Sequence, residues 1–308
     1  LHSTRGALPS VWAATKAGHT IIVSVANRGE AALVKNATAY GASTLLDVCH
    51  HLVGRTPLQP IQPIDEAIEP TTEFDLADVI GQSHAKRALE IAAAGGHNML
   101  MIGPPGAGKS MLAQRMPGIL PPFELEEALA SAAIRSVAGE ALEPNRWRER
   151  PFRSPHHSCS AVALIGGGSS PRPGAVSQAH GGVLFLDEIT EFTRHAIEQL
   201  REPLETGYIN IARANHRVRF PAQCQLLAAC NPCKCGYYGD DSNRCQCSAA
   251  SLLAYQSKLS GPLMDRIDLH VLLQAVKLDA LERRHNQEEK SHQVRERVVA
   301  ARSRQIER

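Results

Sequence analysis

Three features that would indicate a class of protein are missing from this sequence. No run of apolar residues reaches the roughly 18 needed to span a bilayer. The first ten residues, LHSTRGALPS, lack the charged segment and apolar run of a signal peptide. A strong net charge is also missing, since the formal value is only +2, so any argument for nucleic-acid binding must come from local charge. We therefore expect neither a membrane nor a secreted protein.

What is present is the composition of a globular protein, with 43% hydrophobic and 21% charged residues among 308. A chain of this length predicts about two domains, each with its own core. Eight cysteines without a secretory signal favour a reducing, cytoplasmic compartment, in which clustered thiols bind metal more often than they form disulfides. Because the chain starts at Leu1 and stops at Arg308 within a polar helical pattern, we expect it to be part of a longer protein.

Composition divides the chain into four parts. Residues 1–56 alternate a helical stretch, SVWAATKAG, a β-rich run, TIIVSVAN, and a second helical stretch, GEAALVKNATAYGAS, as in a small α/β unit. Residues 57–70 contain four prolines and predict a linker. The main domain is predicted to span residues 71–272. Residues 273–308 are predicted to form the beginning of a polar helical lid.

The main domain predicts an α/β fold. A helix over 83–94 precedes a short apolar strand over 97–102, and GGVLFLDE and CQLLAACN have the length and composition of further buried parallel strands. Strands that alternate with helical patterns predict a three-layer αβα core around a parallel sheet. The segment GGGSSPRPG predicts a flexible loop.

A phosphate-binding loop follows the first of these strands. Residues 103–110, GPPGAGKS, match G-x-x-x-x-G-K-[ST] between a strand and a helical pattern. The glycines allow a tight turn whose N–H groups point inward, and the next helix adds partial positive charge. Lys109 is expected to reach the β and γ phosphates of ATP, and Ser110 to bind Mg²⁺. A chance glycine-rich turn is the alternative, which the flanking pattern disfavours.

An acidic pair, Asp187 and Glu188, follows the apolar run VLFL. Asp187 is expected to hold Mg²⁺ through water, and Glu188 to activate the attacking water as a general base. The pair could also cap the helical stretch ITEFTRHAIEQLREPLE that follows, and the two roles are compatible.

Several segments resemble an AAA+ ATPase module: FDLADVIGQ, GPPGAGKS, LFLDE, the strand that ends in Asn231, and GPLMDRID. Others resemble, more narrowly, the ComM/YifB family of magnesium-chelatase-like AAA+ ATPases: RPFRSPHHSCSAVALIGGG, GAVSQAHGGVLFLDEITEF, LREPLETG and NPCKCGYYGD. The resemblance covers essentially the whole chain, 1–308.

For nucleotide binding, the resemblance places Val79, Ile80 and Gln82 near the adenine, with the loop and the first residues of the next helix around the phosphates. The full expected set is Val79, Ile80, Gln82, Gly103, Pro104, Pro105, Gly106, Ala107, Gly108, Lys109, Ser110 and Met111.

For hydrolysis, the resemblance adds two residues. Asn231 is expected to be the sensor that orients the attacking water beside Glu188, and Arg266 an arginine finger in a neighbouring subunit's site. An ion pair of Arg266 with Asp265 or Asp268 of its own chain is the alternative. The expected catalytic set is therefore Lys109, Asp187, Glu188, Asn231 and Arg266.

At both ends the sequence departs from the family pattern. Residues 1–56 resemble the C-terminal part of a Lon-type protease domain, but PSV at 9–11 stands where a Lon protease has its lysine motif. We therefore expect no peptidase activity, and expect Lys16 to be a solvated helix residue. The resemblance also implies that the lid is incomplete, with its arginine expected beyond Arg308.

The stretch YINIARANHRVRFPAQ predicts a β-hairpin turning at ARANH. Arg213, Arg217 and Arg219 give it three positive charges and no acidic residue. Similar AAA+ helicases carry such a hairpin in the central pore, where basic side chains grip the phosphate backbone without reading sequence. An ordinary solvated hairpin is the alternative.

The resemblance therefore implies a hexameric DNA helicase that hydrolyses ATP to promote branch migration and DNA integration in natural transformation. Its expected partners are single-stranded and branched DNA, further copies of the chain, and recombination proteins. The competing interpretation is a protein remodeller of the magnesium-chelatase or unfoldase type, although an unfoldase usually presents an aromatic residue in its pore loop.

Two C-x-C pairs lie in NPCKCGYYGDDSNRCQC, at 231–247. Four thiolates suit tetrahedral Zn²⁺ and leave no open position, so we predict a structural zinc site in an insertion at 233–247, formed by Cys233, Cys235, Cys245 and Cys247. The C-x-C spacing is shorter than the usual spacing of zinc-binding cysteine pairs. A redox site is disfavoured because no C-x-x-C lies beside a thioredoxin-like unit. The zinc is expected to brace an element at the subunit interface. The other cysteines are predicted to be small buried side chains: Cys49, Cys159, Cys224 and Cys230.

Overall fold

The computed structural model describes residues 1–64, 73–213, 216–239, 244–275 and 288–308, and the chain divides into two compact units. The first unit combines 1–71 with 123–149, and the second combines 72–122 with 150–308. Each unit has a hydrophobic core of its own, as the length of the chain predicts. Within the described ranges, no helix has both the length and the apolar character required to cross a bilayer.

The first unit is a small α/β unit. Its elements are α1 (Ala7–Lys16), β1 (Ile21–Ser24), η1 (Val25–Asn27), α2 (Arg28–Ala32), β2 (Ala39–Ala42), α3 (Leu45–Leu52) and α6 (Leu125–Ala138). Strands β1 and β2 pair in parallel. The core packs Leu8 and Val11 of α1 with Ala128 and Ala132 of α6.

Three segments of this unit differ from the sequence-based expectation. The stretch 29–43 is not helical throughout, because Asn36 adopts a left-handed conformation (φ 63°) and 39–42 pairs with β1 as a strand. Residues 123–149 pack with this unit rather than with the main domain, because the apolar face of α6 is buried in its core. Part of the expected linker also packs: Ile61 is buried and its N–H donates to the Ala39 carbonyl at 2.8 Å. The linker residues 65–70 lie outside the described residues.

The second unit is built on a five-stranded parallel sheet in the order β11-β3-β10-β7-β4. Its elements are η2 (Leu76–Asp78), α4 (Ser83–Gly95), β3 (Met99–Ile102), α5 (Lys109–Ile119), β4 (Phe152–Arg153), α7 (Ala161–Ile165), β5 (Gly166–Gly167), β6 (Arg172–Pro173), α8 (Ala175–Gln178), β7 (Val183–Leu186), η3 (Ile189–Glu191), α9 (Arg194–Glu198), α10 (Arg201–Thr206), β8 (Tyr208–Arg213), β9 (His216–Pro221), β10 (Gln225–Cys230), α11 (Ala249–Gln256), α12 (Gly261–Met264), β11 (Leu269–Leu272) and α14 (Ser291–Ile306).

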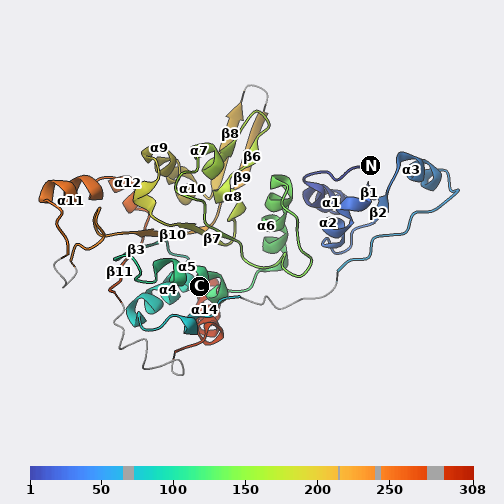
Figure 1. Ribbon diagram of the computed structural model, residues 1–308. Coiled ribbons are helices and arrows are strands. Elements are labelled where there is room, and N and C mark those ends of the chain that lie inside the picture. Colours follow the sequence, from blue (N-terminus) through green and yellow to red (C-terminus); the bar gives the residue numbers. More distant parts are fainter. Residues whose placement is uncertain (65–72, 214–215, 240–243, 276–287) are drawn as a thin grey trace. The chain divides into compact units, whose positions relative to one another are not determined.

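Helices cover both faces of this sheet. Alternate strand residues point to opposite faces, so Met99 and Met101 of β3 share one buried cluster with Leu89 of α4, Leu112 of α5 and Val298 of α14. Figure 1 shows α4, α5 and α14 on one side of the sheet and α7 to α10 on the other. The predicted helix over 83–94, the buried strands and a mixed α/β fold with a parallel sheet are confirmed.

Three expectations for this unit need correction. The stretch 189–205 forms η3, α9 and α10 instead of one helix, since the Thr193 side chain accepts the Ala196 N–H and starts α9. Glu188 precedes η3 without a capping hydrogen bond from its side chain. The glycine-rich loop 166–174 contains a short antiparallel pair, β5 and β6. The polar helix expected near the C-terminus is α14, and it packs on α4 and α5; residues 276–287 of the expected lid lie outside the described residues.

Leu8→Ala is expected to lower the free energy of unfolding of the first unit by about 2–5 kcal/mol, because Leu8 is fully buried and its truncation leaves a cavity. Trp12 and Trp147 are the two tryptophans of the chain and both belong to this unit, so fluorescence during urea unfolding of the whole chain reports on it. Leu45→Ala, at a side chain 69% exposed, is the control and should change the value by less than about 0.5 kcal/mol. Equal losses in the two variants would contradict the burial of α1 in this core.

Candidate functional site

The glycine-rich loop joins β3 to α5 at the carboxyl edge of the sheet. Gly106 (φ 76°) and Gly108 (φ 88°) have the left-handed backbone that tight turns require and that glycine adopts without strain. A Cβ atom on Gly103 would lie 2.7 Å from the Leu273 carbonyl oxygen, so the loop starts in close contact with the chain beyond β11. The loop therefore presents its backbone at the amino end of α5, an arrangement suited to a bound anion.

Lys109, the first residue of α5, is buried and turns back over the loop. Its ammonium group donates to the carbonyl oxygens of Gly103 (2.7 Å) and Pro104 (3.0 Å) and to Oδ1 of Asn231 (3.1 Å). Burial lowers the pKa of Lys109, and the Asp187 carboxylate opposes that shift. The expected lysine and the expected sensor thus lie in direct contact.

The acidic pair lies beside the next residue of α5. Ser110 Oγ donates to Oδ2 of Asp187 at 2.6 Å, which places two hard oxygen donors where Mg²⁺ could be bound. Glu188 has a left-handed backbone (φ 49°), and its N–H donates to Oδ1 of Asp187 at 2.9 Å. The structure therefore brings Lys109, Ser110, Asp187, Glu188 and Asn231 together, as expected from the sequence.

His157 is a member of this site that sequence reasoning missed. Its Nδ1 lies 3.6 Å from Oε2 of Glu188, and its ring packs edge-on against Phe192. His157 follows β4, which pairs in parallel with β7, so both residues come from the same edge of the sheet. Strand β4 has only two residues, and no periodicity in the sequence could have revealed it.

The residues expected near the adenine lie on the other flank of the loop. Val79 is buried in the core and Ile80 is half-buried. Gln82 has a left-handed backbone (φ 53°), and its Nε2 donates to the carbonyl oxygens of Ala107 (3.1 Å) and Gln274 (2.7 Å). Gln82 therefore ties the phosphate loop to the chain after β11, and adenine contact remains a prediction.

Arg266 forms an ion pair within its own chain, but its partner was not foreseen. Its Nη2 donates to Oε2 of Glu205 on α10 at 2.6 Å, rather than to Asp265 or Asp268. The Glu205 carboxylate raises the pKa of Arg266. The backbone carbonyl of Arg266 accepts from Nδ2 of Asn98 at 2.8 Å, which fixes the residue to the start of β3.

The four cysteines of the two C-x-C pairs converge, with their sulfur atoms all within 4.8 Å of one another. Cys233 Sγ lies 3.2 Å from Cys235 Sγ and 3.9 Å from Cys245 Sγ. The backbone N–H of Tyr237, followed by the Cys233 thiol, lowers the pKa of Cys235 to about 6. Four thiols at these distances fit the tetrahedral sulfur coordination of Zn²⁺. Outside the cluster, Cys230 is buried as expected, whereas Cys159 and Cys224 are half-buried and Cys49 is exposed.

The predicted β-hairpin is confirmed: β8 and β9 pair in antiparallel fashion from Tyr208–Pro221 to Arg213–His216. Figure 1 shows the two strands extending together away from the sheet of the second unit. The side chains of Arg217 and Arg219 are exposed, and the Arg219 guanidinium lies 3.6 Å from the centre of the Tyr208 ring. The side chain of Arg213 lies outside the described part of the hairpin.

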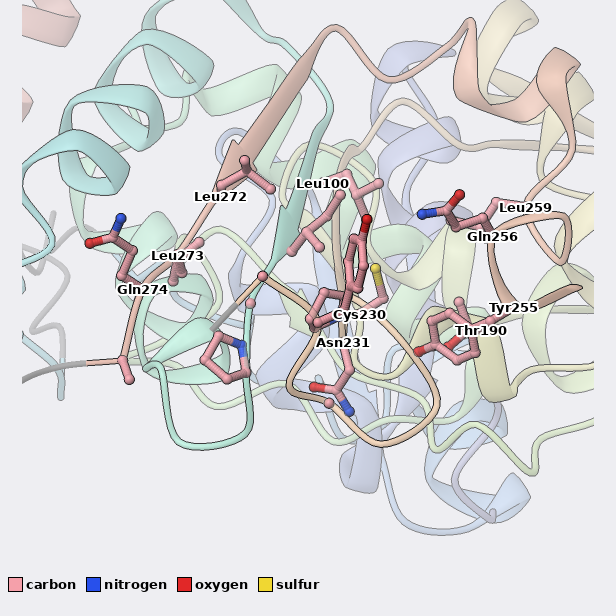
Figure 2. Close-up of a pocket in the computed structure, with 18 of the residues that line it drawn as sticks. Leu100, Thr190, Cys230, Asn231, Tyr255, Gln256, Leu259, Leu272, Leu273 and Gln274 are labelled. Carbon is pink, nitrogen blue, oxygen red and sulfur yellow. The ribbon is translucent and has the colours of Figure 1, made fainter. Parts of the chain in front are cut away.

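A cavity of about 960 Å³ adjoins the phosphate loop. In Figure 2, Cys230 and Asn231 lie between the strand end that carries Leu272 and Leu273 and the helix that carries Tyr255. Gly103, Pro104 and Gly236 also line this cavity, whereas the three residues expected near the adenine do not. The cavity therefore adjoins the start of the phosphate loop but is not lined by the residues expected near the adenine.

The fold and this site define a P-loop nucleotide-binding protein of AAA+ type, in which the loop, an acidic pair and Asn231 lie at adjacent carboxyl ends of parallel strands. The family model of magnesium chelatase, subunit ChlI, matches residues 75–281, and the chain belongs to this family.

Curated relatives confirm the resemblance to ComM and YifB proteins. The chain is 46% identical over 308 residues to YifB of Salmonella typhimurium and to YifB of Escherichia coli, covering 100% of this chain and 60% of each relative. It is 44% identical over 312 residues to the competence protein ComM of Haemophilus influenzae, covering 100% of this chain and 61% of that protein. The chain thus spans about 60% of the length of these relatives.

Proposed function

We propose that the chain is the ATPase part of a ComM-like helicase, a homo-hexameric DNA motor that promotes branch migration and DNA integration during natural transformation. The observation that carries the proposal is the presence, in one unit, of an assembled P-loop site and a hairpin with exposed arginines. The similarity to a competence protein supports it. The motor activity is proposed for the whole protein, of which this chain is a part.

In this proposal the site hydrolyses ATP. The loop N–H groups and Lys109 bind the phosphates, while Ser110 and Asp187 hold Mg²⁺, which would neutralise charge on the β and γ phosphates. Glu188 accepts a proton from the attacking water, and His157 at 3.6 Å orients its carboxylate. Asn231, in contact with Lys109, orients the same water.

Arg217 and Arg219 would bind the phosphates of a DNA strand. They are two residues apart on one strand and therefore project from the same face of the hairpin, opposite the buried Ile209 and Ile211. Contacts with the DNA backbone do not depend on the base sequence. A motor that moves along DNA must bind in this sequence-independent way.

Arg266 would serve the ATP site of a neighbouring subunit. Its exposed ion pair with Glu205 must then open when subunits associate, and a phosphoryl group offers its guanidinium a more highly charged partner.

The cysteine cluster would hold one structural Zn²⁺ through Cys233, Cys235, Cys245 and Cys247. The distances among their sulfur atoms suit a single ion about 2.3 Å from each. Zinc would replace the weak thiol contacts with four strong bonds and stiffen the segment that begins at Asn231.

The DNA proposal predicts that Arg217→Ala with Arg219→Ala, in the full-length protein, weakens binding of forked or single-stranded DNA about tenfold. The slope of log affinity against log salt concentration should fall by about two, because each arginine neutralises about one phosphate. Fluorescence anisotropy at several salt concentrations measures both. Arg201→Ala, which removes an arginine paired with Glu198 on the neighbouring helix, is the control. If neither DNA form alters the ATPase rate of the unmodified protein, the helicase proposal fails and the protein-remodelling alternative is favoured.

The arginine-finger proposal predicts that two inactive variants complement each other. Glu188→Gln lacks the base but retains the finger, and Arg266→Ala lacks the finger but retains the base. In randomly mixed rings, about one site in four joins an intact base with an intact neighbouring finger, so ATP turnover should recover to about a quarter of the original rate. Turnover that remains absent in the mixture would show that Arg266 acts within its own chain.

The zinc proposal predicts about one zinc per chain in protein purified without added metal. Replacing Cys233 and Cys235 by Ser should bring the content below about half an equivalent, because two ligands cannot retain the ion. Cys49→Ser, at an exposed cysteine outside the cluster, should leave the content unchanged. Elemental analysis gives the stoichiometry, and a zinc-free unmodified protein would exclude the site.

A further inference from the structure

The cysteine cluster and the phosphate loop meet at Gly236. This residue follows Cys235, has a left-handed backbone (φ 87°), and donates its N–H to the Cys233 carbonyl at 3.0 Å. A Cβ atom built on Gly236 would lie 2.8 Å from Cδ and 3.0 Å from Cγ of Pro105. Such approaches are closer than side chains tolerate, so the backbone of this turn packs directly on the ring of Pro105 in the loop.

The turn around Gly236 is connected to the nucleotide site at its start and to the cysteine cluster in its middle. At its start, Asn231 accepts a hydrogen bond from Lys109 Nζ at 3.1 Å. In its middle, Cys233 and Cys235 belong to the four-sulfur cluster, and Gly236 is the next residue. A metal held by the cluster therefore fixes the position of the contact with Pro105.

Open space lies beside the same turn. Gly236, Tyr238 and Gly239 line the cavity of about 960 Å³. A segment next to a space of this size can shift into it when its anchors are lost, because no packed side chains oppose the movement. In this segment, the anchors are the thiols of the cysteine cluster.

We propose that Gly236 is a positioning residue that couples metal occupancy of the cysteine cluster to the affinity of the phosphate loop for nucleotide. With metal bound, the turn supports Pro105 and the sensor Asn231; without it, the turn shifts and nucleotide affinity falls. This inference rests on the proposed zinc site and is independent of DNA binding.

The test is Gly236→Ala in the full-length protein. The added methyl group meets the rigid ring of Pro105, so affinity for a fluorescent ATP analogue with Mg²⁺ should fall about tenfold while zinc content stays at the unmodified level. Gly239→Ala is the matched control, because Gly239 has the same kind of backbone (φ 80°) with nothing within 4 Å of its added Cβ. Its effect should be below about twofold, since it adds backbone strain without the contact.

Two further measurements separate positioning from general damage. Adding Pro105→Ala to Gly236→Ala should return the affinity to that of Pro105→Ala alone, because the obstructing ring is gone. Removing zinc by chelation should weaken binding by the unmodified protein about tenfold but change Gly236→Ala little, since coupled effects do not add. Equal losses in the two glycine variants, no loss in Gly236→Ala, or an unmodified protein insensitive to chelation would each overturn the proposal.

If the Gly236→Ala variant loses its zinc, the proposal is tested on the unmodified protein instead. Hydrogen exchange of the amides of Gly103, Gly106, Ala107 and Gly108 should be faster after chelation than before, because the loop loses its support. Unchanged exchange would overturn the proposal.

Discussion

The parallel register of β3, β10 and β7 is the constraint on which the nucleotide site depends. Residues of β10 pair with β3 on one side and β7 on the other, so the loop, Asn231 and the acidic pair all emerge at one edge. Asn98 fixes this register at the opposite edge: its Oδ1 accepts the Leu226 N–H at 2.8 Å, and its Nδ2 donates to the Arg266 carbonyl at 2.8 Å. A slip of one residue would reverse the faces of a strand and remove Asn231 from Lys109.

The burial of the Lys109 ammonium group is a second constraint on this site. Taking Lys109 out of water is unfavourable unless acceptors replace its hydration, and here Gly103, Pro104 and Asn231 provide three. Nearby, the left-handed backbone of Glu188 costs about 1–3 kcal/mol in a residue other than glycine. The hydrogen bond from its N–H to Asp187 helps to offset that cost and fixes the Asp187 carboxylate against the backbone of Glu188.

Local patterns predicted the parts of the site whose chemistry is contiguous in sequence. The P-loop, the acidic pair after VLFL and the arginine-bearing hairpin were found because glycine spacing, apolar runs and alternation are local. His157, the Glu205 partner of Arg266 and the contact of Gly236 with Pro105 were missed, because each joins residues far apart in the chain through tertiary packing. The unit to which helix α6 belongs could not be predicted for the same reason. Its apolar face could be buried in either core, and only tertiary packing determines which one.

The ion pair between Arg266 and Glu205 is compatible with a finger that acts on a neighbouring subunit. Both side chains are accessible to solvent, at 29% and 64% exposure, and ion pairs in water are weak because solvent and salt screen them. The guanidinium also donates from Nη1 to the Pro262 carbonyl at 3.1 Å. The backbone of Arg266 is held independently by Asn98, so breaking these two side-chain contacts frees the guanidinium without moving the segment that carries it. In the proposed assembly, Glu205 would pair with Arg266 in the separate chain, and a phosphoryl group at the subunit interface, with more charge and less water, would compete favourably for it.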